Sequence, residues 1–362
     1  MTVNKEVPSM KQIISKETPL KPLRRVKQLN SNEHREEAID KAMKLIANKC
    51  GESSIMSKEE KENQTIQPLP SGIFSLDEII GVGGYPKGRL IEVFGKESSG
   101  KTTVALHAAS QTQKNNGFVA YIDIENSLDP EYAQNIGVDL DNLYLSQPSS
   151  AEQAFYTIEE FVLTGAFDLI IVDSVASLTP QKEIDGIYLS GEQARLMSEQ
   201  LRKLVAIVNQ SKCVILFINQ IRSTMNKNIG ELETTPGGKA LKFYASVRIE
   251  IICKDAIKNK NGEIIGKKTE LVIQKNKVAA PFKKATVANI YGEGLTPYLD
   301  IIKIGINHGL IKKRGNWYAY NSKKIGNGIF DVKSYLEEHT DVYESLMQEV
   351  QMNEKVHNRR KN

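Results

Sequence analysis

The sequence predicts an α/β fold in which a mostly parallel central sheet is flanked by an N-terminal helix on an arm and by a small α+β domain at the C-terminal end. Short apolar runs alternate with segments of helical periodicity between residues 73 and 290. A glycine-rich loop separates one of these runs from a helix, and from about Gly294 the pattern changes to short helices around basic residues. Alternating strands and helices form parallel sheets that carry ligands at the carboxyl ends of their strands.

The N-terminal part of the chain is polar and is expected to stand apart from the sheet domain. Residues 1–34 carry a cluster of lysine and arginine and are expected to be a disordered basic extension. Within residues 35–70, apolar residues recur on one helical face between Ile39 and Ile46. This segment is predicted to be a docking helix followed by an exposed linker.

Residues 71–294 are predicted to form the sheet domain. The predicted strands are Leu90–Phe94, Phe118–Asp123, Leu169–Asp173, Val214–Gln220, Val247–Ile252, Leu271–Lys275 and Thr286–Ile290. Between them, Ala151–Leu163 and Glu192–Gln210 are predicted helices, and Asn259–Gly262 is a predicted hairpin turn. Residues 295–350 are predicted to be a small C-terminal domain with helices at Leu299–Asn307, Asp331–His339 and Tyr343–Val350, and residues 351–362 a flexible tail.

Composition excludes several classes of protein. The 362 residues are 25 % charged and 40 % hydrophobic, with a formal net charge of +4, which is ordinary for a globular chain. No apolar run is long enough to span a bilayer, and no hydrophobic leader is visible, so we expect a cytoplasmic protein without a membrane partner. The three cysteines lie far apart, and Cys213 opens an apolar strand, where a buried inert thiol is expected.

The loop after the first predicted strand reads G-x-x-x-x-G-K-T and is followed by a helical segment. Such a loop wraps phosphates with backbone N–H groups at a helix N-terminus, and a chance match in a turn would lack this strand–helix context. Lys101 would supply positive charge to the β- and γ-phosphates, and Thr102 would ligate magnesium. The sequence therefore predicts a nucleoside triphosphate site formed by Gly95, Lys96, Glu97, Ser98, Ser99, Gly100, Lys101, Thr102 and Thr103.

Polar residues end three predicted strands at the same sheet edge. Asp173 ends an apolar run, where a carboxylate would hold magnesium. For the carboxylate that activates the attacking water, Asp123, Glu125 and Asp129 compete, and spacing alone leaves the choice open. The amides of Asn219 and Gln220 close a buried strand, which favours a ligand-facing role.

Three further features lie near this edge. Tyr132 would either stack on a base or serve as an ordinary core tyrosine. The segments Asp185–Gly191 and Arg222–Gly238 show no secondary-structure period, and long loops inside compact domains are usually functional. Two loops at one edge would together grip an extended ligand.

Together these residues resemble the bacterial RecA recombinase family. The resemblance covers about residues 35–345 and rests on the segments Gly95–Thr103, Asp123–Pro130, Val172–Ala176, Phe217–Arg222, Gly237–Arg248 and Lys275–Phe282. It implies a RecA-like P-loop ATPase core, with ATP and Mg²⁺ as cofactors and DNA-dependent ATP hydrolysis in recombinational DNA repair and the SOS response to DNA damage.

The resemblance also assigns roles that spacing leaves open. The implied catalytic residues are Lys101, Glu125, Gln220, Lys275 and Lys277. Asp129 and Tyr132 would embrace the adenine, while Thr102 and Asp173 would bind the metal. Lys275 and Lys277 would reach the γ-phosphate held by a neighbouring protomer, with Phe243 at the same boundary.

The implied partners are single-stranded DNA, double-stranded DNA, further copies of the chain in a helical filament, a single-strand-binding protein and a self-cleaving repressor. The two loops would line the filament axis, with Met225 and Ile229 wedging between bases. The implied DNA-binding residues are Arg195, Arg202, Arg222, Met225, Lys227, Ile229, Gly237 and Gly238. In the C-terminal domain, cations around Trp317 are either a duplex-capturing patch or a solvated face.

The chain departs from the family at several positions. Asn126 replaces the usual histidine, Asn228-Ile229 replaces a Met-Phe pair, and the last eight residues are basic where relatives end in an acidic tail. An acidic brake on DNA binding is therefore expected to be weak or absent here. Two alternatives remain at this point: a ring-forming ATPase or helicase with the same core, and a non-hydrolysing accessory protein.

Overall fold

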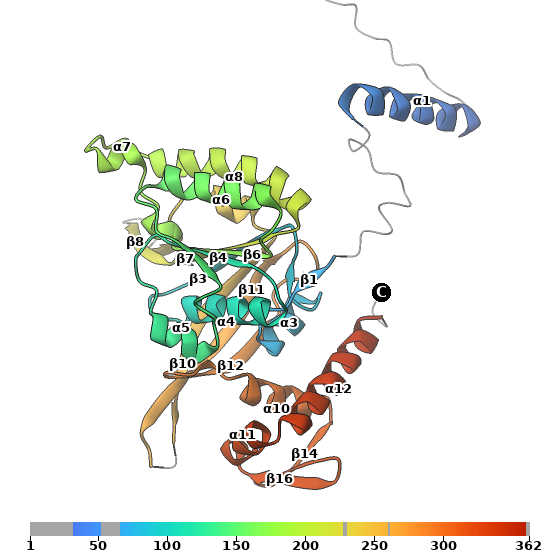
Figure 1. Ribbon diagram of the computed structural model, residues 1–362, viewed down its shortest axis with the longest axis vertical. Helices are drawn as coiled ribbons and strands as arrows, with labels where there is room; N and C mark the ends of the chain where they lie inside the picture. The colour runs from blue at the N-terminus through green and yellow to red at the C-terminus, as the bar shows by residue number, and fades with distance from the viewer. Residues whose placement is uncertain (1–31, 52–65, 227–229, 260, 360–362) are drawn as a thin grey trace, which may run out of the picture. The chain divides into compact units, whose positions relative to one another are not determined.

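The computed structural model describes residues 32–51, 66–226, 230–259 and 261–359 (Figure 1). The chain divides into two compact units, Met1–Thr65 and Ile66–Asn362. In the first unit, α1 (Asn32–Cys50) exposes the apolar side chains of Ile39, Leu45 and Ile46. None of the helices in the described ranges is long and apolar enough to cross a membrane.

The second unit is organised around a nine-stranded sheet with the order β13-β12-β11-β10-β3-β7-β6-β4-β5. Neighbours are parallel from β10 to β5 and antiparallel from β10 to β13. The strands are β3 (Leu90–Gly95), β4 (Val119–Asp123), β5 (Leu143–Ser146), β6 (Leu169–Asp173), β7 (Val214–Gln220), β10 (Val247–Lys258), β11 (Ile264–Asn276), β12 (Lys284–Ile290) and β13 (Gly294–Leu295). The predicted mostly parallel α/β fold is confirmed.

Helices cover both faces of this sheet (Figure 1). On one face lie α3 (Phe74–Ile80), α4 (Lys101–Lys114) and α5 (Pro130–Ile136), and on the other α6 (Ala151–Thr164), α8 (Glu192–Ser211) and α9 (Ala240–Tyr244). Alternation along the strands divides the core: Ile171 packs with the first group of helices and Ile170 with the second. Cys213 is buried in the second core, as expected, and burial raises the pKa of its thiol.

Shorter elements complete this unit. They are β1 (Pro68–Leu69), β2 (Tyr85–Pro86), the 3₁₀ turn η3 (Val175–Ser177) and α7 (Gln181–Ile184). Helix ends follow local sequence: Ser150 accepts a hydrogen bond from the backbone N–H of Gln153 at the start of α6, and Gly165 ends that helix in a left-handed conformation.

The C-terminal domain has its own core. It comprises α10 (Pro297–Asn307), the antiparallel sheet β14 (Ile311–Arg314), β15 (Trp317–Tyr320) and β16 (Lys323–Asn327), and the helices α11 (Ile329–Glu338) and α12 (Thr340–Arg359). It is tied to the sheet domain by Asp300, which is buried and accepts hydrogen bonds from the backbone N–H and the hydroxyl of Ser75 in α3. Burial raises the pKa of Asp300 to about 6.

Two sequence predictions were wrong in this unit. Segment 222–238 is not irregular throughout, because β8 (Arg222–Asn226) and β9 (Gly230–Thr234) pair as an antiparallel hairpin. Hydrophobic periodicity misses a hairpin in which both strands are polar. The C-terminal segment does not leave secondary structure at residue 350, since α12 continues to Arg359.

One buried histidine links α4 to the segment that leads into the C-terminal domain. His107 Nε2 accepts a hydrogen bond of 2.9 Å from the backbone N–H of Leu295. Burial, with a smaller effect of Lys114, lowers the pKa of His107 to about 4. A protonated ring would lose both its acceptor and its favourable burial.

The free energy of unfolding should therefore fall as pH drops from about 6.5 toward 4, because in that window the unfolded chain binds a proton at His107 that the folded chain does not. We expect His107→Gln, whose amide oxygen still accepts from Leu295, to lose less stability between pH 7 and pH 5 than the unsubstituted protein. Urea unfolding at the two pH values measures this. Equal losses in both proteins would contradict the assignment.

Candidate nucleotide-binding site

The glycine-rich loop runs from the end of β3 to the start of α4. A Cβ atom at Gly95 would lie 2.4 Å from the carbonyl oxygen of Ile251, so only glycine fits where β3 passes β10. Gly100 adopts a left-handed conformation immediately before α4. Ser99 Oγ is buried and has no hydrogen-bond partner in the described structure, so this hydroxyl is available to bind a ligand in the loop.

Lys101 begins α4 and is 8 % exposed. Its ammonium donates a hydrogen bond of 2.8 Å to the carbonyl oxygen of Lys96, within the loop itself. Burial lowers the pKa of Lys101, and the nearby carboxylates of Asp173 and Glu125 partly oppose that shift. Within the described structure the acceptor of this buried cation is a neutral carbonyl, so the ammonium is suited to an anionic ligand.

Asp173, at the end of β6, lies directly beside the loop. Its Oδ2 accepts hydrogen bonds from the hydroxyls of Thr102, at 3.0 Å, and Tyr121, at 2.8 Å. Burial raises the pKa of Asp173, while these two hydrogen bonds oppose the shift. A desolvated carboxylate next to a threonine hydroxyl offers the oxygen donors that Mg²⁺ prefers.

Glu125 is the one of the three competing carboxylates that faces other polar side chains of the site. Its Oε1 accepts hydrogen bonds from Ser174 at 2.5 Å, Ser177 at 2.9 Å and the side-chain amide of Gln220 at 3.2 Å. Asp123 instead holds its own loop, through the backbone N–H groups of Ser127 and Leu128. Asp129 caps α5 by accepting from the N–H of Tyr132.

The amides that end β7 have different surroundings. Asn219 is fully buried and donates to Glu92 at 3.0 Å, so the expected ligand-facing role does not fit it. Glu92 also accepts from Arg248 at 2.5 Å. Gln220 is half-buried and faces Glu125, and the next residue, Ile221, donates its N–H to Gly95.

A cavity of about 310 Å³ opens beside the loop. It is lined by Ser98, Gly100, Lys101, Thr102, Thr103, Tyr132, Lys267, Asn289, Tyr291 and Gly292. Tyr132 shares a hydrogen bond of 2.9 Å with Thr103, whereas Asp129 does not line the cavity. Sequence reasoning missed the four residues from β11, β12 and the turn that follows. The only local signal is the Gly292-Glu293-Gly294 pattern, because long-range strand pairing brings them to the loop.

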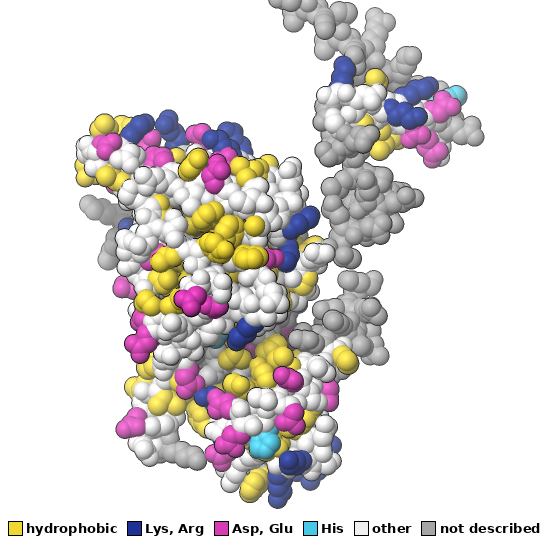
Figure 2. All heavy atoms as spheres, in the orientation of Figure 1, with side chains coloured by type: hydrophobic (Ala, Val, Ile, Leu, Met, Phe, Trp, Pro, Cys, Tyr) yellow, Lys and Arg dark blue, Asp and Glu magenta, His cyan; other side chains and the backbone are white. Residues whose placement is uncertain are grey.

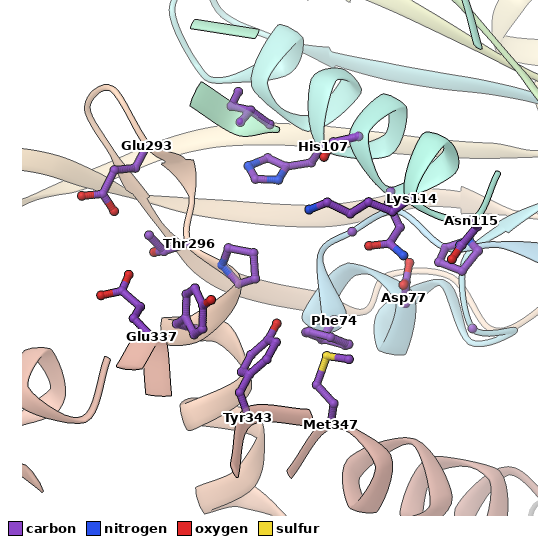
Figure 3. Close-up of a pocket in the computed structure, with 18 of the residues that line it drawn as sticks. Phe74, Asp77, His107, Lys114, Asn115, Glu293, Thr296, Glu337, Tyr343 and Met347 are labelled. Carbon is purple, nitrogen blue, oxygen red and sulfur yellow. The ribbon is translucent and has the colours of Figure 1, made fainter. Parts of the chain in front are cut away.

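A larger cavity of about 1030 Å³ lies between the sheet domain and the C-terminal domain (Figure 3). His107 and Lys114 face it from α4, Phe74 from α3, and Tyr343 and Met347 from α12. None of the glycine-rich loop residues lines it. The larger volume is therefore not the nucleotide site.

The structure brings the predicted boundary residues together on another surface. Lys275 donates to the carbonyl oxygens of Lys242, at 2.6 Å, and Phe243, at 2.8 Å, and Lys277 donates to Phe243 at 3.3 Å. Burial lowers the pKa of Lys275, and the charge of Lys277 adds to the shift. The Phe243 side chain is 70 % exposed.

The predicted DNA-binding residues lie on two neighbouring segments. Arg195 and Arg202 are on α8, and Lys and Arg side chains follow the edge that α7 and α8 form (Figure 2). A Cβ atom at Gly238 would lie 2.8 Å from Cβ of Ala194, so this end of the second segment packs against α8. Arg222 is exposed, while Lys227, Ile229 and the side chain of Met225 lie outside the described part of the structure.

Comparison with known proteins identifies the family of this chain. The chain matches the family model described as the RecA N-terminal domain over residues 37–296, and that described as the RecA C-terminal domain over residues 299–355. The chain belongs to the RecA family.

Its RecA relatives match along nearly their whole length. The protein named "Protein RecA, plasmid" from Lactococcus lactis subsp. lactis is 57 % identical over 323 residues, covering 89 % of this chain and 94 % of the relative. The RecA protein of Lactobacillus johnsonii is 46 % identical, covering 88 % and 89 %. That of Staphylococcus carnosus is 46 % identical, covering 86 % and 88 %.

The metal site of a RecA-family chain need not be a cluster of protein ligands. Within the described ranges, no group of three His, Cys, Asp or Glu side chains is arranged to hold a metal ion. Mg²⁺ in nucleotide sites keeps several waters and binds phosphates, with one or two protein ligands. The pair formed by Thr102 and Asp173 fits that pattern.

Removing the Lys101 ammonium should abolish nucleotide binding by this RecA-family chain, because three carboxylates lie close to Lys101 and, without its charge, would repel the incoming phosphates more strongly. We expect Lys101→Ala to show no saturable binding of ATP in isothermal titration. A matched control is Lys114→Ala at the other end of α4, which should bind as the unsubstituted protein does. Unchanged ATP affinity in Lys101→Ala would contradict the site.

Proposed function

We infer that this chain is a DNA recombinase with DNA-dependent ATPase activity. The observation that carries the inference is the meeting of Glu125 and Gln220 beside the glycine-rich loop, at the start of the β8–β9 hairpin. The proposed hydrolytic carboxylate, the proposed sensor amide and a candidate DNA-binding segment are thus directly connected. Because the chain belongs to the RecA family, we interpret this connection as the link between ATP hydrolysis and DNA binding.

We propose ATP as the nucleotide and Mg²⁺ as its metal. The residues present fit both, because a buried ammonium and the orphaned Ser99 hydroxyl await an anion, and Thr102 with Asp173 offers oxygen ligands. When bound, Mg²⁺ neutralises charge on the phosphate oxygens. Tyr132 is proposed to lie against the adenine from its place in the cavity lining.

Glu125 is proposed to take the proton from the attacking water. The three hydrogen bonds on Oε1 fix the carboxylate, and in the described structure its other oxygen, Oε2, receives none of them. Oε2 is therefore the oxygen available to accept a proton. Gln220 donates to this carboxylate, and a single residue separates it from β8, so a change at the γ-phosphate would alter the position of the hairpin.

The proposed assembly is a helical filament of identical protomers. Lys275 and Lys277, held at the Phe243 carbonyl, are proposed to act on the nucleotide of a neighbouring protomer. A repeated head-to-tail contact that does not close into a ring produces a filament. ATP bound at the boundary would hold the filament together, and its hydrolysis would release it.

A second surface fits such an assembly. Strand β5 is an edge of the nine-stranded sheet, and the apolar side chains of Phe118, Tyr144, Leu145 and Tyr156 around it are about half exposed or more. An apolar edge of this kind needs a partner to cover it. We propose that α1 of a second copy, with its exposed Ile39, Leu45 and Ile46, provides that cover.

Single-stranded DNA is proposed to lie along the α8 and β8–β9 segments, with the chain searching a duplex by base pairing. In the C-terminal domain, Trp317 is half exposed, and the Lys324 ammonium lies 4.8 Å from its ring centroid. Lys and Arg side chains gather at the end that β14 and β16 form (Figure 2). This basic aromatic surface is proposed to capture duplex DNA.

The first experiment is negative-stain electron microscopy with single-stranded DNA and a slowly hydrolysed ATP analogue. Extended helical filaments on the DNA are expected. Closed rings would contradict the filament and favour a helicase-like ATPase. Bare DNA with monomeric protein would contradict the recombinase and favour an accessory protein.

Glu125→Gln should retain filament assembly on DNA but slow ATP turnover by at least about 100-fold, because the substituted amide cannot take a proton. Phosphate release measures turnover, and electron microscopy checks assembly. Asp129→Asn, which keeps an oxygen to cap α5, is the matched control and should retain most of the turnover. Near-normal turnover in Glu125→Gln would place the base elsewhere.

Leu145→Asp should prevent self-assembly, because a charge on the β5 edge would be buried without a partner when α1 of another copy covers it. Sedimentation with single-stranded DNA and the ATP analogue measures assembly. Ile264→Asp, at a similarly exposed apolar residue in β11, is the control and should sediment normally. Normal assembly of Leu145→Asp would exclude the β5 edge as the contact surface.

A further inference from the structure

One cation in the nucleotide cavity has no role in the site described above. Lys267 lies in β11 and pairs in register with Asn289 of β12, and both side chains line the cavity. The Lys267 ammonium donates a hydrogen bond to the carbonyl oxygen of Ser98, in the glycine-rich loop. An antiparallel strand thus delivers a second lysine to the loop, about 170 residues away in sequence from the first.

The two lysines are held in the same way. Lys101 donates to the loop carbonyl of Lys96, and Lys267 to that of Ser98. A hydrogen bond between an ammonium and a neutral carbonyl is weaker than one to a charged phosphate oxygen, so either ammonium would exchange its carbonyl for an incoming phosphate. Lys267 therefore occupies a resting position rather than a final one.

The charges around the loop indicate what Lys267 contributes to the site. Asp173, Glu125 and Glu97 all lie close enough to Lys101 to influence it electrostatically, and so does Lys267. With Lys101 alone, three carboxylates would face one ammonium where a polyanionic nucleotide must bind. A second ammonium from the same protomer reduces that repulsion before any neighbouring protomer arrives.

The position of Lys267 also indicates which part of the nucleotide it would contact. It shares the cavity with Tyr132, Tyr291 and Gly292, whereas Glu125 and Gln220 lie outside the cavity lining. Lys267 thus shares the cavity with both tyrosines and with Lys101, while the proposed hydrolytic carboxylate lies outside its lining. The phosphate within that part of the nucleotide is the one next to the ribose.

We propose that Lys267 is a nucleotide-binding residue whose ammonium leaves the Ser98 carbonyl to contact the α-phosphate of ATP or ADP. The proposal rests on the proposed ATP-binding function of the cavity. Lys267 would set the affinity for nucleotide in the isolated protomer, while the proposed contribution of Lys275 and Lys277 depends on assembly.

The neighbouring residue provides a matched control. Successive side chains alternate across a strand, and Lys268 points away from the cavity toward Asp255, with its ammonium 3.9 Å from that carboxylate. Lys267→Gln and Lys268→Gln thus remove the same charge from the same strand on opposite faces. Lys267→Arg keeps the charge at the cavity.

The test is isothermal titration of the full chain, without DNA, with ADP and with a slowly hydrolysed ATP analogue. We expect Lys267→Gln to weaken both ligands by about tenfold, the loss of one charge-assisted hydrogen bond. Lys268→Gln should bind as the unsubstituted protein does, and Lys267→Arg should recover most of the affinity. The affinity of Lys267→Gln should also depend less on salt concentration.

Three results would overturn the proposal. Unchanged affinity in Lys267→Gln would leave Lys267 as a tether of the loop alone. Weakening of the ATP analogue without weakening of ADP would move the contact to the γ-phosphate. Equal weakening by Lys267→Arg and Lys267→Gln would indicate a steric effect. If Lys101→Ala also bound normally, the nucleotide site itself would fail; if only Lys267→Gln did, the site would stand without this contact.

Discussion

The parallel register of the central strands is the constraint on which the site depends. Gly95 lies beside Gln220 where β3 pairs with β7, and Asp123 lies beside Asp173 where β4 pairs with β6. Strands β4, β6 and β7 end in the polar residues Asp123, Asp173 and Gln220, and the register places these ends at one edge. A slip of one residue would turn each side chain to the opposite face, so the hydrophobic cores on both faces also protect the geometry of the site.

A buried charge network stabilises the strands that lead to this edge of the sheet. Glu92 in β3 is fully buried, and it accepts from Arg248 in β10 and from Asn219 in β7. Arg248 also lies over the ring of Phe94, 4.4 Å from its centroid. Breaking one partner of such a network leaves a buried charge uncompensated, which typically costs about 3–5 kcal/mol. The network therefore holds three neighbouring strands together immediately before the glycine-rich loop.

The turn after β12 connects the nucleotide cavity with the larger cavity beside the C-terminal domain. Tyr291 and Gly292 line the nucleotide cavity, while the next residue, Glu293, lines the cavity beside the C-terminal domain and pairs with Lys333 of α11 at 2.7 Å. His107 holds the following backbone from α4, the helix that begins at the glycine-rich loop. The nucleotide cavity is thus connected to the C-terminal domain through this turn and through α4.

The sequence by itself determined the fold class, the glycine-rich loop and the strand-end positions of Asp173 and Gln220, because each depends on local patterns of apolar residues and on a motif within one strand–loop–helix unit. Spacing left Asp123, Glu125 and Asp129 open as candidates, and only the family resemblance named Glu125. The tertiary structure shows how their surroundings differ: Asp123 holds its own loop, Asp129 caps a helix and Glu125 accepts from Gln220. Likewise Lys267 and Asn289 reach the cavity through antiparallel pairing of β11 with β12. Both residues are far in sequence from the glycine-rich loop, so local hydrophobic periodicity could not predict their place in the site. Local patterns determine elements, whereas side-chain partners follow from strand pairing between distant segments.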